Sequence, residues 1–143
     1  MKVIVLVKAT NESEANPLPS EAELREMGNY NEELAKAGVL LAAEGLQPSR
    51  KGKRLVFKGG SRSFVDGPFA ETKELVAGFW IWQVQSMEEA LEWARRMPNP
   101  YRGDGEVELR PVAGDDDLGE AFTPDLREQS DRVRARAEGK ELT

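Results

Sequence analysis

Residues 76–84 place four large apolar side chains in a row, Phe79, Trp80, Ile81 and Trp82. Successive side chains of a β-strand point to opposite faces of the sheet, so Trp80 and Trp82 share one face while Phe79 and Ile81 share the other. An aromatic side chain buries about 150–250 Å² when it is covered, which makes exposure of either face costly. The segment therefore predicts a strand within a sheet that is covered on both sides.

Three further segments have strand character. Val3–Val7 is uniformly apolar and predicts a second strand that is covered on both faces. Val39–Leu46 is mostly apolar, whereas Glu106–Val112 alternates between apolar and charged residues. This difference predicts that residues 3–7 and 76–84 form the centre of the sheet and that the other two segments form its edges.

Two helices are expected between these strands. Ser20 can cap the first, with Glu23 completing a capping box, and Gly38 ends it. Ser86 can cap the second in the same way, and Pro98 ends that helix. The apolar positions of each helix recur every three or four residues and predict one buried stripe. The stripes comprise Leu24, Met27, Tyr30, Leu34 and Ala37 in the first helix and Met87, Ala90, Leu91, Ala94 and Met97 in the second.

A β-hairpin is predicted between the second and third of these strands. Leu55–Lys58 and Ser61–Val65 are separated by two glycines, which supply the positive φ angles of a tight turn. With the hairpin as an insertion, the element order is βαββαβ, the order of the ferredoxin-like α+β plan, in which both helices cover one face of the sheet. Phe79 and Ile81 then need a cover on the other face. We expect a second copy of the chain there, in a homodimer.

The sequence contains neither cysteine nor histidine. This excludes disulfides, thiolate and imidazole metal ligands, and every mechanism that needs a catalytic Cys or His. Acid–base chemistry is left to Asp, Glu, Lys, Tyr or bound water. We expect no metal and no cofactor, because nucleotide-binding glycine motifs are absent and Asp115–Asp117 is contiguous rather than spaced for chelation.

The formal net charge is −6, and residues 115–143, with nine acids and five bases, account for −4 of it. The rest of the chain is nearly neutral, so we expect no nucleic-acid partner. The longest apolar runs are far too short to span a bilayer, and the N-terminus has no signal-peptide pattern. We therefore expect a cytoplasmic protein without a membrane partner.

The character of the sequence changes after Val112. We expect one domain over residues 1–113, followed by an acidic linker and a helical tail over residues 114–143. Thr123-Pro124-Asp125 is a typical helix start, and the tail helix is predicted to run to about Glu138.

The segment Asp66–Glu74, DGPFAETKE, is the most unusual stretch of the chain. Its first three residues are explained as a turn, in which Gly67 permits a positive φ, with Phe69 as an anchor in the core. A charged loop on a rigid scaffold is also typical of a functional site.

Together with Gly78-Phe79-Trp80, this segment resembles the signature of the DGPF-domain proteins, the YCII-related family. The segments Ala37–Leu40, Glu44–Pro48 and Gly105–Pro111 also resemble the family pattern, so the resemblance covers residues 1–113. It implies a dimeric α+β barrel of two ferredoxin-like subunits, in agreement with the expected homodimer. Family members are often encoded beside sigma factors of the extracytoplasmic-function type.

One branch of the wider family has a His on the first helix and an Asp-Pro-Tyr after the second, a pair proposed as catalytic. The matching positions here are Met27 and Asn99, and Asn99 is followed by Pro100 and Tyr101. Both polar partners of the pair are missing, so this chain cannot use it.

Two carboxylates are candidates for acid–base catalysis. Glu44 follows an apolar strand segment, and its pKa would rise if its side chain entered a cavity; a strand-end Glu that points to water is the alternative. Asp66 can supply a second carboxylate, with its role in the turn as the alternative. The candidate ligand contacts are Tyr30, Phe79, Trp80, Trp82 and Lys73, and core packing is the alternative for the aromatic residues.

Six basic residues lie between positions 50 and 62 with no acid among them. They can bind an anion, or they can protect the edges of a solvated hairpin by charge.

Two functions fit these features. The first is a small-molecule enzyme or binder with its pocket between helices and sheet or between two sheets. The second is a non-catalytic regulatory protein, linked to an extracytoplasmic-function sigma factor, that contacts its partner through the Asp66–Glu74 loop or the acidic tail. Polar signature residues that converge in a pocket would favour the first, and outward display would favour the second.

Overall fold

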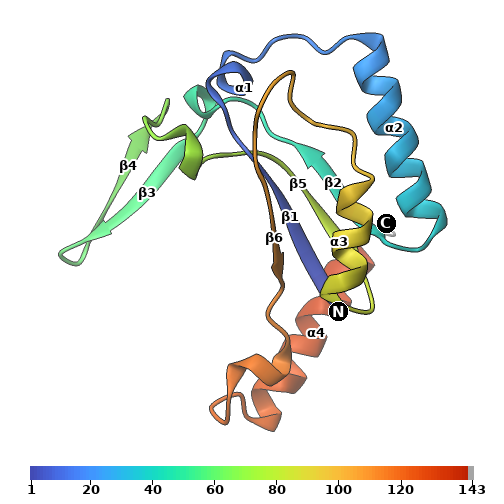
Figure 1. Cartoon of the computed structure of the whole chain (residues 1–143). Helices are drawn as coiled ribbons and strands as arrows, with labels where there is room; N and C mark the ends of the chain where they lie inside the picture. Colours follow the sequence, from blue (N-terminus) through green and yellow to red (C-terminus); the bar gives the residue numbers. More distant parts are fainter. Residues whose placement is uncertain (142–143) are drawn as a thin grey trace. The chain divides into compact units, whose positions relative to one another are not determined.

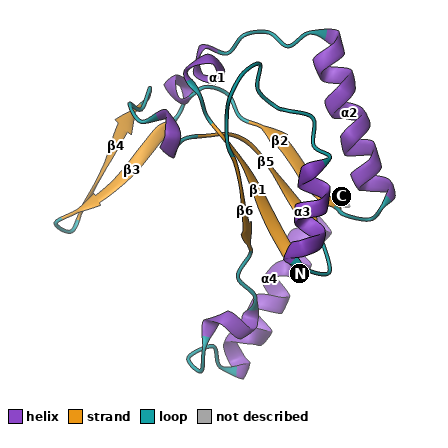
Figure 2. Ribbon diagram, viewed as in Figure 1, coloured by secondary structure: helices purple, strands orange, loops and turns teal. Residues whose placement is uncertain are grey.

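The computed structural model describes residues 1–141, which divide into one unit over Met1–Pro111 and a second that begins at Val112. Figures 1 and 2 show the arrangement of the elements. The first unit holds β1 (Lys2–Lys8), α1 (Asn11–Ala15), α2 (Glu21–Lys36), β2 (Leu40–Gly45), the 3-10 helix η1 (Ser49–Lys51), β3 (Lys53–Lys58), β4 (Ser61–Asp66), the 3-10 helix η2 (Thr72–Glu74), β5 (Val76–Gln83), α3 (Met87–Arg95) and β6 (Val107–Pro111). The second unit holds the 3-10 helix η3 (Asp115–Leu118) and α4 (Pro124–Glu141).

The first unit has an α+β fold built on a four-stranded sheet with the order β2-β5-β1-β6. Every neighbouring pair in this sheet is antiparallel. β1 and β5 are the inner strands and β2 and β6 the edges, as the apolar pattern of the sequence predicted. Strands β3 and β4 form a separate two-stranded sheet.

The two inner strands bury one face of the sheet beneath α2 and α3, which lie on the same side in Figure 1. Val5 lies opposite Trp80 and Val3 opposite Trp82, so these side chains share that face. Trp82 is completely buried and Trp80 is 5% exposed. The helices contribute Tyr30 and Leu34 from α2 and Ala90 from α3 to this core.

The other face of the sheet carries the alternate residues of the same strands. Ile4 lies opposite Ile81 and Leu6 opposite Phe79, and all four side chains are half-buried. We call these four residues the helix-free face, because they lie on the side of the sheet opposite to α2 and α3. The division of the aromatic run between two faces therefore follows the sequence prediction.

The helices begin where the sequence indicates but bury less than expected. Ser20 and Glu23 form a complete capping box at α2, and Gly38 follows the helix with a φ of 74°. Leu24 and Ala37, which were expected in the buried stripe, are exposed, and Ala37 is the C-cap that follows the helix. At α3, Ser86 accepts from the backbone of Glu89, but the Glu89 carboxylate accepts from the backbone N–H of Gln85 rather than closing the box on Ser86. Leu91 is also exposed, at 40%.

The hairpin forms as predicted, with Gly59 and Gly60 at φ angles of 56° and 78°. The polar segment after β1 contains a short helix, α1, because Thr10 and Ser13 form a capping box at its start. One other expectation was wrong. The tail helix continues through Gly139 to Glu141 instead of ending at about Glu138.

Candidate functional site

A cleft of about 560 Å³ opens at the carboxyl end of β1. Its walls come from the segment that links β1 to α2, from the start of α2 and from the loop between α3 and β6, with smaller contributions from the ends of β2 and β5. The lining residues are Thr10, Asn11, Glu12, Ser13, Asn16, Pro17, Pro19, Glu23, Leu46, Ala77, Pro100, Tyr101, Arg102, Gly103 and Asp104.

The first wall is held in place by local hydrogen bonds of α1. The backbone N–H of Thr10 donates to Ser13 Oγ at 2.8 Å, and the backbone N–H of Ser13 donates to Thr10 Oγ1 at 3.1 Å. The α1 helix ends at Ala15, and its C-cap residue Asn16 adopts the left-handed conformation with a φ of 54°. The helix places Asn11 and Glu12 in the lining of the cleft.

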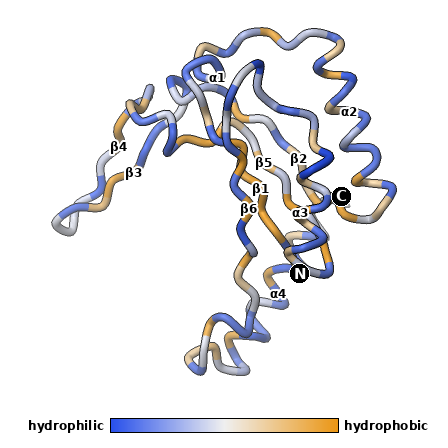
Figure 3. Tube along the Cα trace, in the orientation of Figure 1, coloured by the Kyte–Doolittle hydropathy of each residue, from blue (hydrophilic) through white to orange (hydrophobic). Residues whose placement is uncertain are grey.

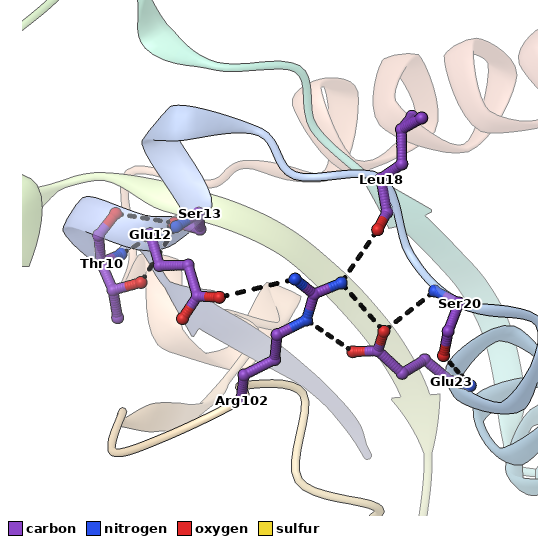
Figure 4. Close-up of polar contacts among 7 residues, drawn as sticks. All are labelled: Thr10, Glu12, Ser13, Leu18, Ser20, Glu23 and Arg102. Atoms are coloured by element: carbon purple, nitrogen blue, oxygen red, sulfur yellow. Dashed lines mark hydrogen bonds and ion pairs between the residues drawn. The ribbon is translucent and has the colours of Figure 1, made fainter.

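Arg102 lines the cleft and joins two of its walls, and Figure 4 shows its contacts with Glu12, Glu23 and Leu18. Its guanidinium donates to both carboxylate oxygens of Glu23, at 3.0 and 3.2 Å, and to the carbonyl oxygen of Leu18 at 2.9 Å. Glu12 lies 3.7 Å from the same guanidinium. The two-pronged contact with Glu23 fixes the α3–β6 loop against the start of α2.

These contacts determine the charge state of Glu23. The hydrogen bond from Arg102, followed by the capping contacts with Ser20, lowers the pKa of Glu23 from 4.5 to about 2. The same pairing raises the pKa of Arg102. Both groups therefore stay ionised at neutral pH, and Glu23 is unsuited to donate a proton to a ligand there.

Tyr101 forms the base of the third wall. Its hydroxyl lies 2.5 Å from the carbonyl oxygen of Lys8 and 2.6 Å from that of Glu106, so it can donate to either and links the loop to β1. Burial raises the pKa of Tyr101, which keeps the hydroxyl protonated. A Cβ atom at Gly105 would lie 2.3 Å from the Tyr101 ring, so only glycine leaves room for this position of the ring.

The charged residues that line the cleft are mostly acidic. Glu12, Glu23 and Asp104 face one basic residue, Arg102, and leave a formal charge of −2. The amide side chains of Asn11 and Asn16 add neutral donors and acceptors. Such a site is suited to a polar ligand that is neutral or positively charged.

None of the seven candidate residues from the sequence lines this cleft in the part of the chain that the structure describes. Glu44 is exposed at the edge of the helix-free face, opposite Phe79. Asp66 is exposed and forms an ion pair with Lys53 across the hairpin. Lys73 is exposed in η2.

The three remaining aromatic candidates lie in the core. The Tyr30 hydroxyl donates to the carbonyl oxygen of Trp93 at 2.6 Å, and burial raises its pKa to about 12. Its ring meets Trp80 edge to face with 6.2 Å between centroids. Trp80 Nε1 donates to the side-chain oxygen of Asn31 at 2.8 Å. Trp82 Nε1 has no hydrogen-bond partner among the described residues.

The DGPF signature anchors the base of the hairpin. The backbone N–H of Phe69 donates to Ser49 Oγ at 3.1 Å, while the Ser49 hydroxyl and backbone N–H both bind the Glu14 carboxylate of α1. Phe69 is half-buried, and the guanidinium of Arg54 lies 3.9 Å from the centroid of the Phe69 ring. The expectation that Phe69 is an anchor in the core was therefore wrong. Gly67 does not have a positive φ, contrary to expectation.

The sequence contained two signals for the cleft that the prediction did not use. The first is Asn99-Pro100-Tyr101, which resembles the Asp-Pro-Tyr of one branch of the wider family. In the structure Asn99 Oδ1 accepts from the backbone of Tyr101 at 2.9 Å, and Pro100 and Tyr101 line the cleft. The second is Thr10, because threonine is a favoured N-cap residue and predicts a helix start at this point.

Residues 1–141 contain no group of three or more carboxylates placed to hold a metal ion. Within the same range, no helix combines the length and the apolar composition needed to cross a bilayer.

The fold and cleft define an α+β protein with an antiparallel sheet and a polar cleft at the end of an inner strand. Comparison with known families matches the YCII-related domain to residues 1–114, and the chain belongs to this family. A protein of Rhizobium meliloti (strain 1021), named "Uncharacterized protein R00369", is 34% identical over 93 residues, which cover 65% of this chain and 75% of that protein. The family assignment made from the sequence is confirmed.

Proposed function

We propose that the protein is a homodimeric α+β barrel that binds a small polar organic molecule in the cleft at the end of β1. The observation that carries the proposal is the cleft itself. Its volume of about 560 Å³ lies within the range of about 300–1,000 Å³ that is typical of small-ligand sites.

The chemistry of the walls narrows the class of ligand. Arg102 is already held by Glu23 and offers no free fork to a ligand carboxylate. Glu12 and Asp104 provide acceptors for ammonium or hydroxyl groups. An amine or a polyhydroxy compound therefore suits the cleft better than an acid does.

The cleft has the groups needed to bind a polar ligand. None of its lining residues with an altered pKa is suited to proton transfer near neutral pH. Glu23 stays ionised because Arg102 lowers its pKa to about 2. Tyr101 stays protonated because burial raises its pKa. Neither Glu23 nor Tyr101 is therefore a candidate for proton transfer near neutral pH, and binding is the function we assign to the cleft.

The sheet supports the ferredoxin-like plan and the dimeric barrel. Its order, β2-β5-β1-β6, is that of a ferredoxin-like subunit with the β3–β4 hairpin inserted between two strands. The helix-free face has an apolar centre of Ile4, Leu6, Phe79 and Ile81, with charged residues such as Glu44 and Arg110 on the edge strands. An apolar centre with a polar rim is typical of a subunit interface.

A second candidate is a regulatory protein that contacts another protein, such as an extracytoplasmic-function sigma factor. The observation that favours it is the outward display of the signature. The Asp66 side chain is 75% exposed, and Lys73 is exposed as well. Under this alternative, Lys73→Ala would weaken partner binding and leave the cleft unchanged.

The cleft proposal can be tested by NMR titration with two probes of similar length, the diamine putrescine and the dicarboxylate succinate. We expect putrescine to shift the amide resonances of residues 11–16 and 101–104 and succinate to leave them unchanged. Shifts with succinate alone would contradict the charge argument. No shift of these resonances with either probe would count against a polar binding cleft.

A matched pair of variants controls for indirect effects. A Cβ atom at Gly103, which lines the cleft, meets nothing within 4 Å, so we expect Gly103→Leu to add bulk to the cleft without a clash at its Cβ. Gly28 in α2 is equally open but lies outside the cleft. We expect Gly103→Leu to abolish the putrescine shifts and Gly28→Leu to retain them.

A further inference from the structure

The β3–β4 hairpin carries an apolar face that the described residues of the first unit leave largely exposed. Leu55 lies opposite Phe64, and Phe57 lies opposite Arg62, so these side chains point to the same face of the hairpin. Phe64 is 72% exposed, Phe57 is 66% exposed and Leu55 is 40% exposed. We call Leu55, Phe57 and Phe64 the apolar hairpin face.

Figure 1 shows the hairpin extending from the four-stranded sheet away from α2, and Figure 3 shows hydrophobic segments on both of its strands. An isolated two-stranded hairpin is marginally stable in water, and exposed phenylalanines on it promote association. The apolar hairpin face therefore requires an explanation beyond the fold of the monomer.

The base of the hairpin is fixed by hydrogen bonds. Gly67 N–H donates to the carbonyl oxygen of Gly52 at 3.0 Å, and Phe69 N–H donates to Ser49 Oγ at 3.1 Å. Ser49 is bound in turn by Glu14 of α1. The hairpin is thus held in one direction before it meets a partner, which lowers the entropic cost of docking.

The charges of the chain indicate what the partner is. Residues 50–66 hold six basic residues and one acid, a net charge of +5. Because the whole chain carries −6, the remaining residues together carry −11. A basic arm on an acidic body is complementary to a second copy of itself.

We propose that the hairpin is a dimerisation arm, whose apolar hairpin face docks on the acidic body of a second copy of this chain. The inference rests on the proposed homodimer and adds a contact that the helix-free face does not include. Arg62, 4.9 Å from the centroid of Phe57, and Lys58 at the tip would then meet carboxylates of that copy.

The available area supports this assignment. From their exposed fractions, the two phenylalanines and Leu55 can bury roughly 300 Å² per arm. A two-fold axis uses the contact twice, and each arm covers a matching area of its partner, so two arms contribute roughly 1,200 Å², the lower end of stable interfaces.

The test is sedimentation velocity over a range of protein concentrations. We expect the double variant Phe57→Ser, Phe64→Ser to raise the dimer dissociation constant by at least about tenfold. Leu18→Ser is the control, because Leu18 is 88% exposed and lies outside the hairpin. It should leave the dissociation constant unchanged, and circular dichroism should confirm that both variants are folded.

A charge-reversal variant, Lys58→Glu with Arg62→Glu, tests the second half of the proposal. It should weaken the dimer and remove most of the salt dependence of dimerisation. A photo-crosslinking amino acid at position 57 should join two copies, which a mixture of isotopically light and heavy chains will reveal. Crosslinks only within one copy would contradict the proposal.

The outcomes separate this inference from the proposed function. A dimer that is unchanged by Phe57→Ser, Phe64→Ser but broken by Ile81→Glu overturns the dimerisation arm and keeps the helix-free interface. A monomeric wild-type chain overturns both interfaces and leaves the ligand test of the cleft unaffected. A monomer whose hairpin retains nucleic acid or lipid would show that the partner is not a second copy.

Discussion

The carbonyl oxygen of Ser49 occupies the space in which a side chain at position 67 would begin. A Cβ atom at Gly67 would lie 1.8 Å from that oxygen and 2.7 Å from the carbonyl carbon. Since both atoms belong to the backbone, no rotation of a side chain can relieve the contact. The glycine of the DGPF signature is therefore explained by packing at the base of the hairpin.

Gly67→Ala should destabilise the protein by at least about 2 kcal/mol, because the hairpin base has to move away from Ser49. Gly28→Ala is the control, since a Cβ there meets nothing within 4 Å in the middle of α2. It should stabilise the protein by about 0.5–1 kcal/mol through helix propensity. Urea unfolding measures both values. Equal changes in unfolding free energy for the two variants would show that the Ser49 carbonyl does not exclude a side chain at position 67.

The two core tryptophans should respond differently to replacement by phenylalanine. Trp80→Phe removes the hydrogen bond from Nε1 to Asn31, whereas Trp82→Phe removes a buried donor that has no partner among the described residues. Both variants lose ring volume. We expect Trp80→Phe to cost about 1 kcal/mol more in unfolding free energy. An equal or larger loss for Trp82→Phe would contradict the idea that the hydrogen bond to Asn31 decides the difference between the two variants.

The Glu23–Arg102 pair predicts a dependence of stability on pH. The pKa of Glu23 in the folded protein, about 2, is lower than its ordinary value of 4.5. A lowered pKa stabilises the fold above pH 4.5, and this contribution is lost as the pH falls from 4.5 towards 2. We expect the difference in melting temperature between wild type and Glu23→Gln to be constant above about pH 5 and to shrink below it. A constant difference down to pH 2 would exclude the ion pair as its cause.

Gly105→Ala should displace the ring of Tyr101. The new Cβ would lie 2.3 Å from the ring, so the hydroxyl would lose its contacts with the carbonyl oxygens of Lys8 and Glu106. We expect the free energy of unfolding to fall by about 1–3 kcal/mol. Gly103→Ala should lower it by less than about 0.5 kcal/mol, because the added Cβ atom there meets open space. Chemical denaturation measures the loss, and similar values for the two variants would contradict this role of Gly105.

The elements of the first unit follow from local patterns in the sequence. The run Phe79–Trp82 predicted an inner strand with two apolar faces, and the glycines at 59 and 60 predicted the hairpin turn. The capping box of Ser20 predicted the start of α2. Each of these signals depends on residues within a few positions of one another. The corresponding elements can therefore be predicted from the sequence alone.

The cleft depends on contacts that no local pattern contains. Arg102 binds Glu23 across a separation of 79 residues, and Tyr101 binds Lys8 across 93. The position of Gly67 depends on Ser49, a neighbour only after the hairpin has formed. The sequence analysis therefore selected candidate site residues by their chemical type, as carboxylates and aromatics. The walls of the cleft come instead mostly from loops that only the tertiary structure brings together.

Native mass spectrometry of the protein, purified gently from its own cells, tests the central claim most directly. We predict a dimer that carries a reproducible small polar molecule, which is retained by Gly28→Leu and lost from Gly103→Leu. The same adduct on Gly103→Leu, or a wild-type protein that carries no molecule, would contradict the assignment of the cleft as the binding site.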